Sequence, residues 1–257
     1  MTNLPAGVDA VILAGGPNDG PLRDCSPAGY EALIEIGDRP MVDYVVAALA
    51  QSPSIRKLVL VGAAEICEQI HRRTVLHALP GDNPVGSVLN GVKALPGDNR
   101  VLLVAADIPL ITPEAIEDFI QACANTQADF YYPIVSRTDN DRYYPDIKRT
   151  YVTLKEGVFT GGNLFLVNPR IIDHCALWAE EMVGLRKSPL GLCRKLGLGI
   201  VIKFFCRCLT IAELEQKVSS LLGVQARTVI TRHPEIGVDV DKPGDLQSVT
   251  RILEGRH

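Results

Sequence analysis

The sequence lacks an excess of basic residues and any long hydrophobic run. Its 257 residues contain 26 Lys and Arg against 30 Asp and Glu, which gives a formal net charge of −4. This balance argues against general nucleic-acid binding, which needs a basic surface. No stretch reaches the roughly 18 apolar residues of a membrane span, and residues 1–8 lack the features of a signal peptide. We therefore expect a cytoplasmic protein without a nucleic-acid partner.

The sequence also lacks the cysteine pattern of a disulfide-bonded or zinc-binding protein. It has seven cysteines, an odd number, and none of them form a Cys-x-x-Cys motif. We expect reduced and mostly buried thiols, as in a reducing compartment. The close pair Cys206 and Cys208 leaves metal binding or redox sensing open, although no further Cys or His lies at ligand spacing.

What the sequence does contain is the composition and the pattern of an α/β protein. Hydrophobic residues make up 47% and charged residues 22%, and the length suits one domain over residues 1–257. Short β-branched runs alternate with helical stretches, which predicts three α/β/α layers around a mixed, mostly parallel, Rossmann-like sheet. Strands are expected at 8–13, 57–61, 101–105, 129–134, 163–167 and 227–231. Helices are expected at 41–51, 64–73, 85–94, 113–124, 169–181 and 242–253.

Two segments depart from this alternation. Residues 139–162 are rich in Arg, Lys and Tyr and lack a clear period, so we expect a loop that closes over a substrate. Residues 170–222 are expected to form a helical insertion. Within it, residues 185–209 mix apolar and basic side chains, which suits packing in the core or between subunits of a homodimer, or else contact with a membrane surface.

The first expected strand runs into a glycine-rich loop. Leu13, Ala14, Gly15 and Gly16 stand at its carboxyl end, where free backbone amides can hold phosphate oxygens. The dinucleotide fingerprint Gly-x-Gly-x-x-Gly is absent, and no helix follows at once. Taken alone, the two glycines are equally typical of a turn.

Carboxylates occur at two further places where a ligand site is expected. Asp107 ends a buried strand, at the edge where open α/β sheets bind ligands. Mg²⁺ binds one or two carboxylates together with substrate phosphates, so a single Asp there is sufficient. Asp239 and Asp241 alternate with valines, which directs both carboxylates to one side. The alternatives are that Asp107 is an acid at a helix start and that Asp241 caps a helix.

Three motifs in this order resemble those of the MobA-like nucleotidyltransferases, which have the GT-A fold. They are Leu-Ala-Gly-Gly at 13–16, Asp-Ile-Pro at 107–109 and Asp-Val-Asp-Lys-Pro-Gly-Asp-Leu at 239–246. The resemblance spans nearly the whole chain. It implies Mg²⁺-dependent transfer of a nucleoside monophosphate from a nucleoside triphosphate to a small anionic or hydroxyl acceptor, with Asp107, Asp239 and Asp241 as metal ligands.

The resemblance also implies roles for residues outside these motifs. Ser87 and Gly91 match the loop that binds the base and ribose, and Gly162 and Asn163 match the strand that contacts the acceptor. Arg23 is similar to a loop arginine that acts on the phosphates. In the basic segment before Gly162, Lys148 and Arg149 are expected to pair with an anionic group of the acceptor.

One position departs from the family pattern. Glu31 stands where the family has a lysine that contacts the triphosphate, and its negative charge would repel phosphates. It must therefore turn away, face a metal ion, or mark a protein that binds nucleotides or sugar phosphates without turnover. A GT-A glycosyltransferase is a further alternative, disfavoured because the Asp-x-Asp motif is absent at Asp107.

Overall fold

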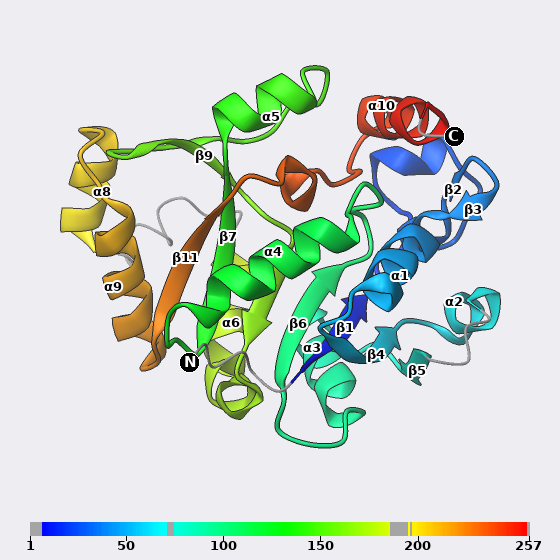
Figure 1. Cartoon of the computed structure of the whole chain (residues 1–257), viewed down its shortest axis with the longest axis horizontal. Coiled ribbons are helices and arrows are strands. Elements are labelled where there is room, and N and C mark those ends of the chain that lie inside the picture. The colour runs from blue at the N-terminus through cyan, green and yellow to red at the C-terminus, as the bar shows by residue number, and fades with distance from the viewer. Residues whose placement is uncertain (1–6, 71–74, 186–194, 196, 256–257) are drawn as a thin grey trace.

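A mixed sheet of nine strands forms the centre of the computed structural model, which describes residues 7–70, 75–185, 195 and 197–255 (Figure 1). The strand order is β5-β4-β1-β6-β10-β7-β9-β8, and β11 pairs with the other edge of β7. The strands are β1 (Val8–Leu13), β4 (Ile55–Val61), β5 (Val75–Ala78), β6 (Arg100–Ala105), β7 (Phe130–Ser136), β8 (Val152–Leu154), β9 (Gly157–Gly161), β10 (Leu164–Val167) and β11 (Ala226–Thr231). A separate two-stranded ribbon joins β2 (Glu35–Ile36) to β3 (Arg39–Pro40).

The parallel part of the sheet brings three strand ends to the same level. β1 lies between β4 and β6 and is parallel to both. Leu13, the last residue of β1, is in register with Val61 of β4 and Ala105 of β6. The loops that follow β1 and β6 therefore leave the sheet at one edge, where α/β folds bind ligands.

Helices cover both faces of the sheet, as Figure 1 shows for α1 and α4 in front and α3 and α6 behind. Side chains from α1 (Met41–Gln51), α2 (Ala64–Gln69) and α4 (Pro113–Ala124) pack on one face. The opposite face is covered by α3 (Pro84–Lys93), α6 (Ile172–Leu185), α8 (Leu198–Phe205) and α9 (Ile211–Leu222). No helix within the described ranges is long and apolar enough to cross a membrane. The predicted three-layer, mostly parallel α/β fold is confirmed.

All six predicted strands and all six predicted helices are present, and β1, α1 and α4 have the predicted ends while the others are shifted. The helix predicted at 64–73 is described only as α2, and residues 71–73 lie outside the described part. The prediction missed β5 and the short ribbon. It also treated residues 139–162 as a loop, whereas α5 (Arg137–Tyr143) and the β8–β9 hairpin occupy much of that segment. The start of α5 is fixed locally, because the Ser136 hydroxyl accepts a hydrogen bond from the Asp139 backbone (3.0 Å).

Three described helices lie between β10 and β11, where the helical insertion was expected. Thr210 begins α9 with a capping box that includes Glu213. Within the segment predicted to touch a membrane or a second subunit, residues 186–194 and 196 lie outside the described residues. On α8, the side chains of Ile202, Phe204 and Phe205 are exposed.

The expectation of mostly buried thiols is wrong for the described cysteines. Only Cys123 is buried, in the face of α4 that packs on the sheet, whereas Cys25, Cys206 and Cys208 are exposed in turns. Cys193 lies outside the described residues. Among the described residues, the one group with metal-ligand spacing contains no cysteine.

Candidate functional site

Three chain segments are joined by backbone hydrogen bonds at the carboxyl edge of the sheet. The Ala106 amide donates to the Leu13 carbonyl oxygen (3.3 Å), which links the loops after β6 and β1. The Val240 amide donates to the Asp107 carbonyl oxygen (2.9 Å), which brings in the segment before α10 (Pro243–Glu254). The glycine loop, Asp107 and the late acidic motif therefore meet, although they are far apart in sequence.

A separate apolar cluster holds these segments in place. It contains Leu110 from the Asp107 loop, Ile147 from the segment before β8, and Val238 and Val240 from the acidic motif. Val238 and Val240 are fully buried. Because side chains alternate along an extended segment, burial of the valines turns Asp239 and Asp241 the other way, as the sequence predicted.

Asp107, Asp239 and Asp241 form a compact carboxylate cluster. One oxygen from each lies within 4.8 Å of the others. Asp107 Oδ1 is buried and has no hydrogen-bond partner among the described residues. Since a buried carboxylate oxygen without a donor is costly, the arrangement fits a divalent cation, which prefers oxygen ligands.

The alternative interpretations of the two acidic motifs do not hold in the structure. α4 begins at Pro113, and its N-cap is Thr112, which accepts from the Ala115 amide (3.2 Å), so Asp107 is not a helix-start acid. The N-cap of α10 is Lys242, whose amide donates to Asp245 (3.1 Å). Asp241 is thus not the cap of that helix.

The field at the cluster is strongly negative. Burial raises the pKa of Asp107 to about 6, and the charges of Asp241 and Glu31 add to the rise, while a backbone hydrogen bond and the charge of Arg149 oppose it. Burial is likewise the main cause of the raised pKa of Glu31, followed by Asp241 and Asp19. The smaller contributions from neighbouring carboxylates show that these groups repel one another, a repulsion that a bound cation would relieve.

Arg149 brings a positive charge next to the carboxylate cluster. Its guanidinium forms an ion pair with Asp239, and both side chains are only 13% exposed. Lys148 is exposed and forms no ion pair with another described residue. The sequence interpretation assigned both cations to the acceptor, and it did not foresee that Arg149 would contact a predicted metal ligand.

Glu31 faces the glycine loop. Its amide donates to the Gly16 carbonyl oxygen (3.1 Å). Its carboxylate oxygens lie 3.8 Å and 3.6 Å from the positions that a Cβ would take at Gly16 and Gly20. The carboxylate therefore lies beside the predicted nucleotide loop and has not turned away from it.

The remaining predicted residues lie in three separate surroundings. Arg23 is exposed in a 3-10 helix (Pro21–Asp24) and has no ion pair within the described ranges. The buried Ser87 hydroxyl accepts from the Gly81 amide (3.0 Å). Gly91 is buried, and Val11 and Val61 lie too close to leave room for a Cβ there.

Gly162 and Asn163 continue β9 toward Asp107. A Cβ at Gly162 would lie only 2.7 Å from Ile236 Cγ2, so close packing requires a glycine. The Asn163 carbonyl oxygen accepts from the Ala105 amide (3.0 Å), which places it beside the strand that leads to Asp107. Asn163 Nδ2 is buried and has no hydrogen-bond partner among the described residues.

Comparison with known proteins supports the same fold. A "Hypothetical transferase" from Thermus thermophilus is 33% identical and has a TM-score of 0.84, with 93% of this chain and 99% of that chain covered. CMP:2-keto-3-deoxy-manno-octonic acid synthetase complexed with CTP is 12% identical with a TM-score of 0.63 over 98% and 100% of the two chains. A nucleotidyl transferase from Methanothermobacter thermautotrophicus is 16% identical with a TM-score of 0.59 over 98% and 99%.

The search of curated proteins gives no match. The profile of the MobA-like NTP transferase domain, however, matches residues 10–192, which is more than half of the sequence. That range includes the glycine loop, Asp107 and Arg149. The chain belongs to the MobA-like NTP transferase family.

Proposed function

We propose that this protein transfers a nucleoside monophosphate from a nucleoside triphosphate to a phosphate or hydroxyl group of a small acceptor. The observation that carries the proposal is the cluster of Asp107, Asp239 and Asp241, within 4.8 Å of one another beside a glycine-rich loop. A triphosphate and an anionic acceptor repel each other, so their reaction needs a site that gathers positive charge.

In this proposal the three aspartates hold Mg²⁺. The buried and unpaired Asp107 Oδ1 fits that assignment, because a metal ion would supply its missing partner. When bound, the ion neutralises charge on the phosphate oxygens. Arg149 remains beside Asp239, where its second face can meet an acceptor phosphate.

The nucleotide lies over the loop of Leu13, Ala14, Gly15 and Gly16, with backbone amides near its phosphates. Exposed Arg23 contacts the phosphates, and Ser87, Gly91 and their helix border the nucleoside. Lys148, Gly162 and Asn163 border the acceptor. Each of these roles is assigned from the family pattern.

The reaction is a displacement at the α-phosphorus. An acceptor oxygen forms a bond to that phosphorus, the bond to the β-phosphate bridging oxygen breaks, and pyrophosphate leaves with the electron pair. An acceptor phosphate is already ionised at neutral pH, so the chain needs no general base for it, whereas a hydroxyl acceptor passes its proton to the departing pyrophosphate. The contribution of the protein is to align the two anions and to exclude water.

Glu31 is part of this proposal. Its carboxylate faces the glycine loop and lies close enough to Asp107 to raise the pKa of that residue. We assign Glu31 to the side of the site that faces the metal. There its carboxylate increases the affinity for a divalent cation and does not itself contact phosphate.

A panel of ATP, CTP, GTP and UTP, each with and without MgCl₂, tests nucleotide binding by thermal unfolding. At least one triphosphate should raise Tm only with Mg²⁺. Pyrophosphate release with phosphate-monoester acceptors then tests transfer. Binding without release would favour a non-catalytic protein, and hydrolysis of nucleotide sugars without binding of triphosphates would favour a glycosyltransferase.

A further inference from the structure

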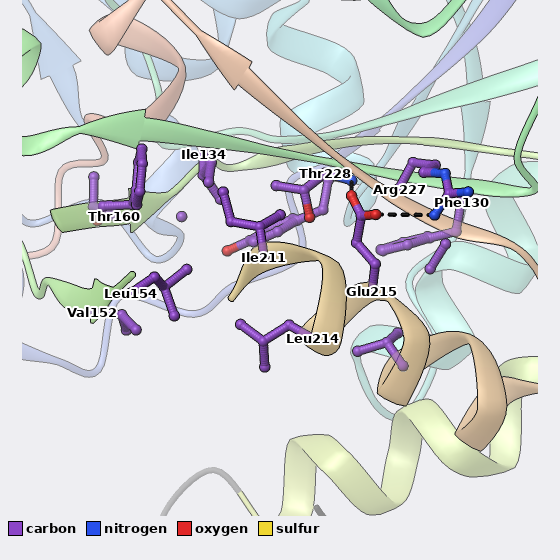
Figure 2. Close-up of a pocket in the computed structure, with 15 residues that line it drawn as sticks. Phe130, Ile134, Val152, Leu154, Thr160, Ile211, Leu214, Glu215, Arg227 and Thr228 are labelled. Carbon is purple, nitrogen blue, oxygen red and sulfur yellow. Dashed lines mark hydrogen bonds and ion pairs between the residues drawn. The ribbon is translucent and has the colours of Figure 1, made fainter. Parts of the chain in front are cut away.

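A largely apolar cavity of about 270 Å³ lies between α9 and the sheet. Figure 2 shows it bordered by Leu214 of α9, by Ile134 on the sheet and by Leu154 of the β8–β9 hairpin. Phe159 and Val218 extend the apolar lining. The cavity is partly open to solvent, so a ligand could enter it and bury apolar surface against this lining.

The two charged side chains that line the cavity are paired with each other. Glu215 accepts hydrogen bonds from Arg227 Nη1 (3.0 Å) and from the Thr228 amide (2.6 Å), as the dashed lines in Figure 2 show. Among the described residues, no other charged side chain lines the cavity. The chemistry of the lining therefore suits a hydrocarbon group.

The cavity lies next to the proposed acceptor side of the site. Thr160 and Gly161 of β9 line it, and the next two residues, Gly162 and Asn163, lead to the strand end before Asp107. The chain before Val152, another lining residue, carries Arg149. One end of the cavity thus borders the residues assigned to the acceptor.

Tyr132 lies between the apolar cavity and the acceptor residues. Its ring lines the cavity, and its hydroxyl lies over Gly161, where any Cβ would collide with it. Burial raises the pKa of Tyr132, and the positive charge of Arg149 opposes that rise, so the guanidinium lies within electrostatic reach of the ring. The Tyr132 side chain thus lies close both to the apolar space and to Arg149.

Because the apolar cavity lies next to the acceptor residues, we infer that the acceptor is amphiphilic, with a phosphate or hydroxyl end at Arg149 and a hydrocarbon portion in the cavity under α9. The inference rests on the proposed function, because it names the class of acceptor for that reaction. It predicts that recognition depends on apolar length as well as on charge.

A series of n-alkyl phosphates tests it on the full chain. Calorimetric titration with methyl, butyl, hexyl and octyl phosphate, at saturating Mg²⁺ and an α,β-methylene nucleotide that cannot react, should show affinity rising on the order of fourfold per methylene. The gain in affinity should end at the alkyl length that fills the cavity. Leu214→Trp fills the cavity and should flatten the series to the affinity of methyl phosphate.

Two further variants keep the result interpretable. Val218→Phe narrows the same space with a smaller change if Leu214→Trp unfolds, and urea unfolding reports the folding of each. Leu177→Trp adds the same ring on α6 at a position that is 80% exposed and does not line the cavity, so it should keep the wild-type series.

A flat series in wild-type protein that binds methyl phosphate would overturn the inference and leave the proposed function standing. A rise in affinity with alkyl length that persists in both cavity variants would also overturn the inference, since the alkyl groups would then bind elsewhere. Failure of the proposed function has another signature, the absence of Mg²⁺-dependent binding by all four triphosphates.

Discussion

The Arg149 guanidinium is ion-paired with Asp239, a residue of the carboxylate cluster, and both side chains are only 13% exposed. Asp107 and Asp241 lie within 4.8 Å of the same carboxylate. Arg149 is thus the cation that offsets a group of negative charges before any ligand binds. It also joins the acceptor segment to the proposed metal site, so an acceptor that engages Arg149 would change the charge seen by Asp239.

The first prediction concerns this pair. Arg149→Met should lower the free energy of unfolding by on the order of 3 kcal/mol, because it leaves a buried carboxylate without its partner. MgCl₂ should restore more stability to the variant than it adds to the wild type, since a cation can replace the lost charge. Urea unfolding with and without MgCl₂ measures both effects.

The matched control for Arg149 is Arg137→Met. Arg137 pairs with Asp141 on the exposed surface of α5, where the side chains are 60% and 51% exposed. Such pairs contribute about 0.5 kcal/mol or less. Equal losses in the two variants would show that the Arg149 pair is an ordinary surface contact.

The second prediction separates stability from ligand binding at Asp107. Asp107→Asn removes one of several like charges, so the metal-free protein should gain on the order of 1 kcal/mol. The variant should lose Mg²⁺-dependent stabilisation by nucleotide, which in the wild type should reach about 2.7 kcal/mol at about 100 times Kd. Thermal and urea unfolding measure the two quantities.

Asp98→Asn is the control for Asp107, because Asp98 pairs with Arg170 at a fully accessible position where both side chains are at least 75% exposed. It should change neither the metal-free stability nor the effect of nucleotide. Retention of the full Mg²⁺-dependent shift by Asp107→Asn would remove this residue from the metal site.

The third prediction concerns a network that supports the acidic motif. His233 contacts Asp118 of α4 (2.8 Å) and Glu235 (3.3 Å), and Thr112 donates to Glu235 (3.2 Å). Burial would lower the pKa of His233, but hydrogen bonds and charges from Asp118 and Glu235 raise it above its ordinary value. The network fixes the turn that leads to Asp239.

A raised pKa means that the protonated His233 stabilises the folded state. Its contribution is fully present below about pH 6.5, the ordinary histidine pKa, and is lost as the pH rises through the folded-state pKa. His233→Gln should therefore cost about 1 kcal/mol at pH 5.5 and much less at pH 8.5. Urea unfolding at both pH values measures the difference in stability loss. Asp118→Asn removes one partner of His233 and should also reduce the pH dependence of stability. Equal losses at the two pH values would contradict the assignment.

Local patterns predicted the fold and one half of the site. Strand ends can be predicted from hydrophobic runs, so the position of Asp107 at the sheet edge followed directly from the sequence. The alternation of valines predicted that Asp239 and Asp241 share a side, and burial of Val238 and Val240 is the physical cause.

The other half of the site depends on contacts between distant segments. Nothing near Arg149 in sequence indicates Asp239, and the pair forms only because Ile147 and Val238 pack in one cluster. The four residues of β5 and the short β8 and β9 strands carry too little periodicity to be recognised. The cavity beside Tyr132 is a property of packing and has no sequence signal.

The last prediction concerns Glu31, whose carboxylate lies by Gly16 and Gly20 and within electrostatic reach of Asp107 and Asp241. Glu31→Lys places an ammonium group among the carboxylates, where it competes with a divalent cation. Charges about 4 Å apart interact by about 4 kcal/mol at an effective dielectric of 20. Mg²⁺-dependent nucleotide binding should therefore weaken by at least about tenfold, and binding without Mg²⁺ should strengthen. Calorimetric titration across a range of MgCl₂ concentrations measures both.

Glu31→Gln is the matched variant, because it removes the charge without adding a cation. It should weaken Mg²⁺-dependent binding by less than Glu31→Lys does. Tighter Mg²⁺-dependent binding by the lysine variant would mean that the natural site has lost affinity for triphosphate, and would favour binding without turnover. An unchanged affinity in both variants would place Glu31 outside the nucleotide site. A graded loss from Glu31 through Gln to Lys would instead show that the carboxylate serves the metal, since only a cation-binding role responds in that order.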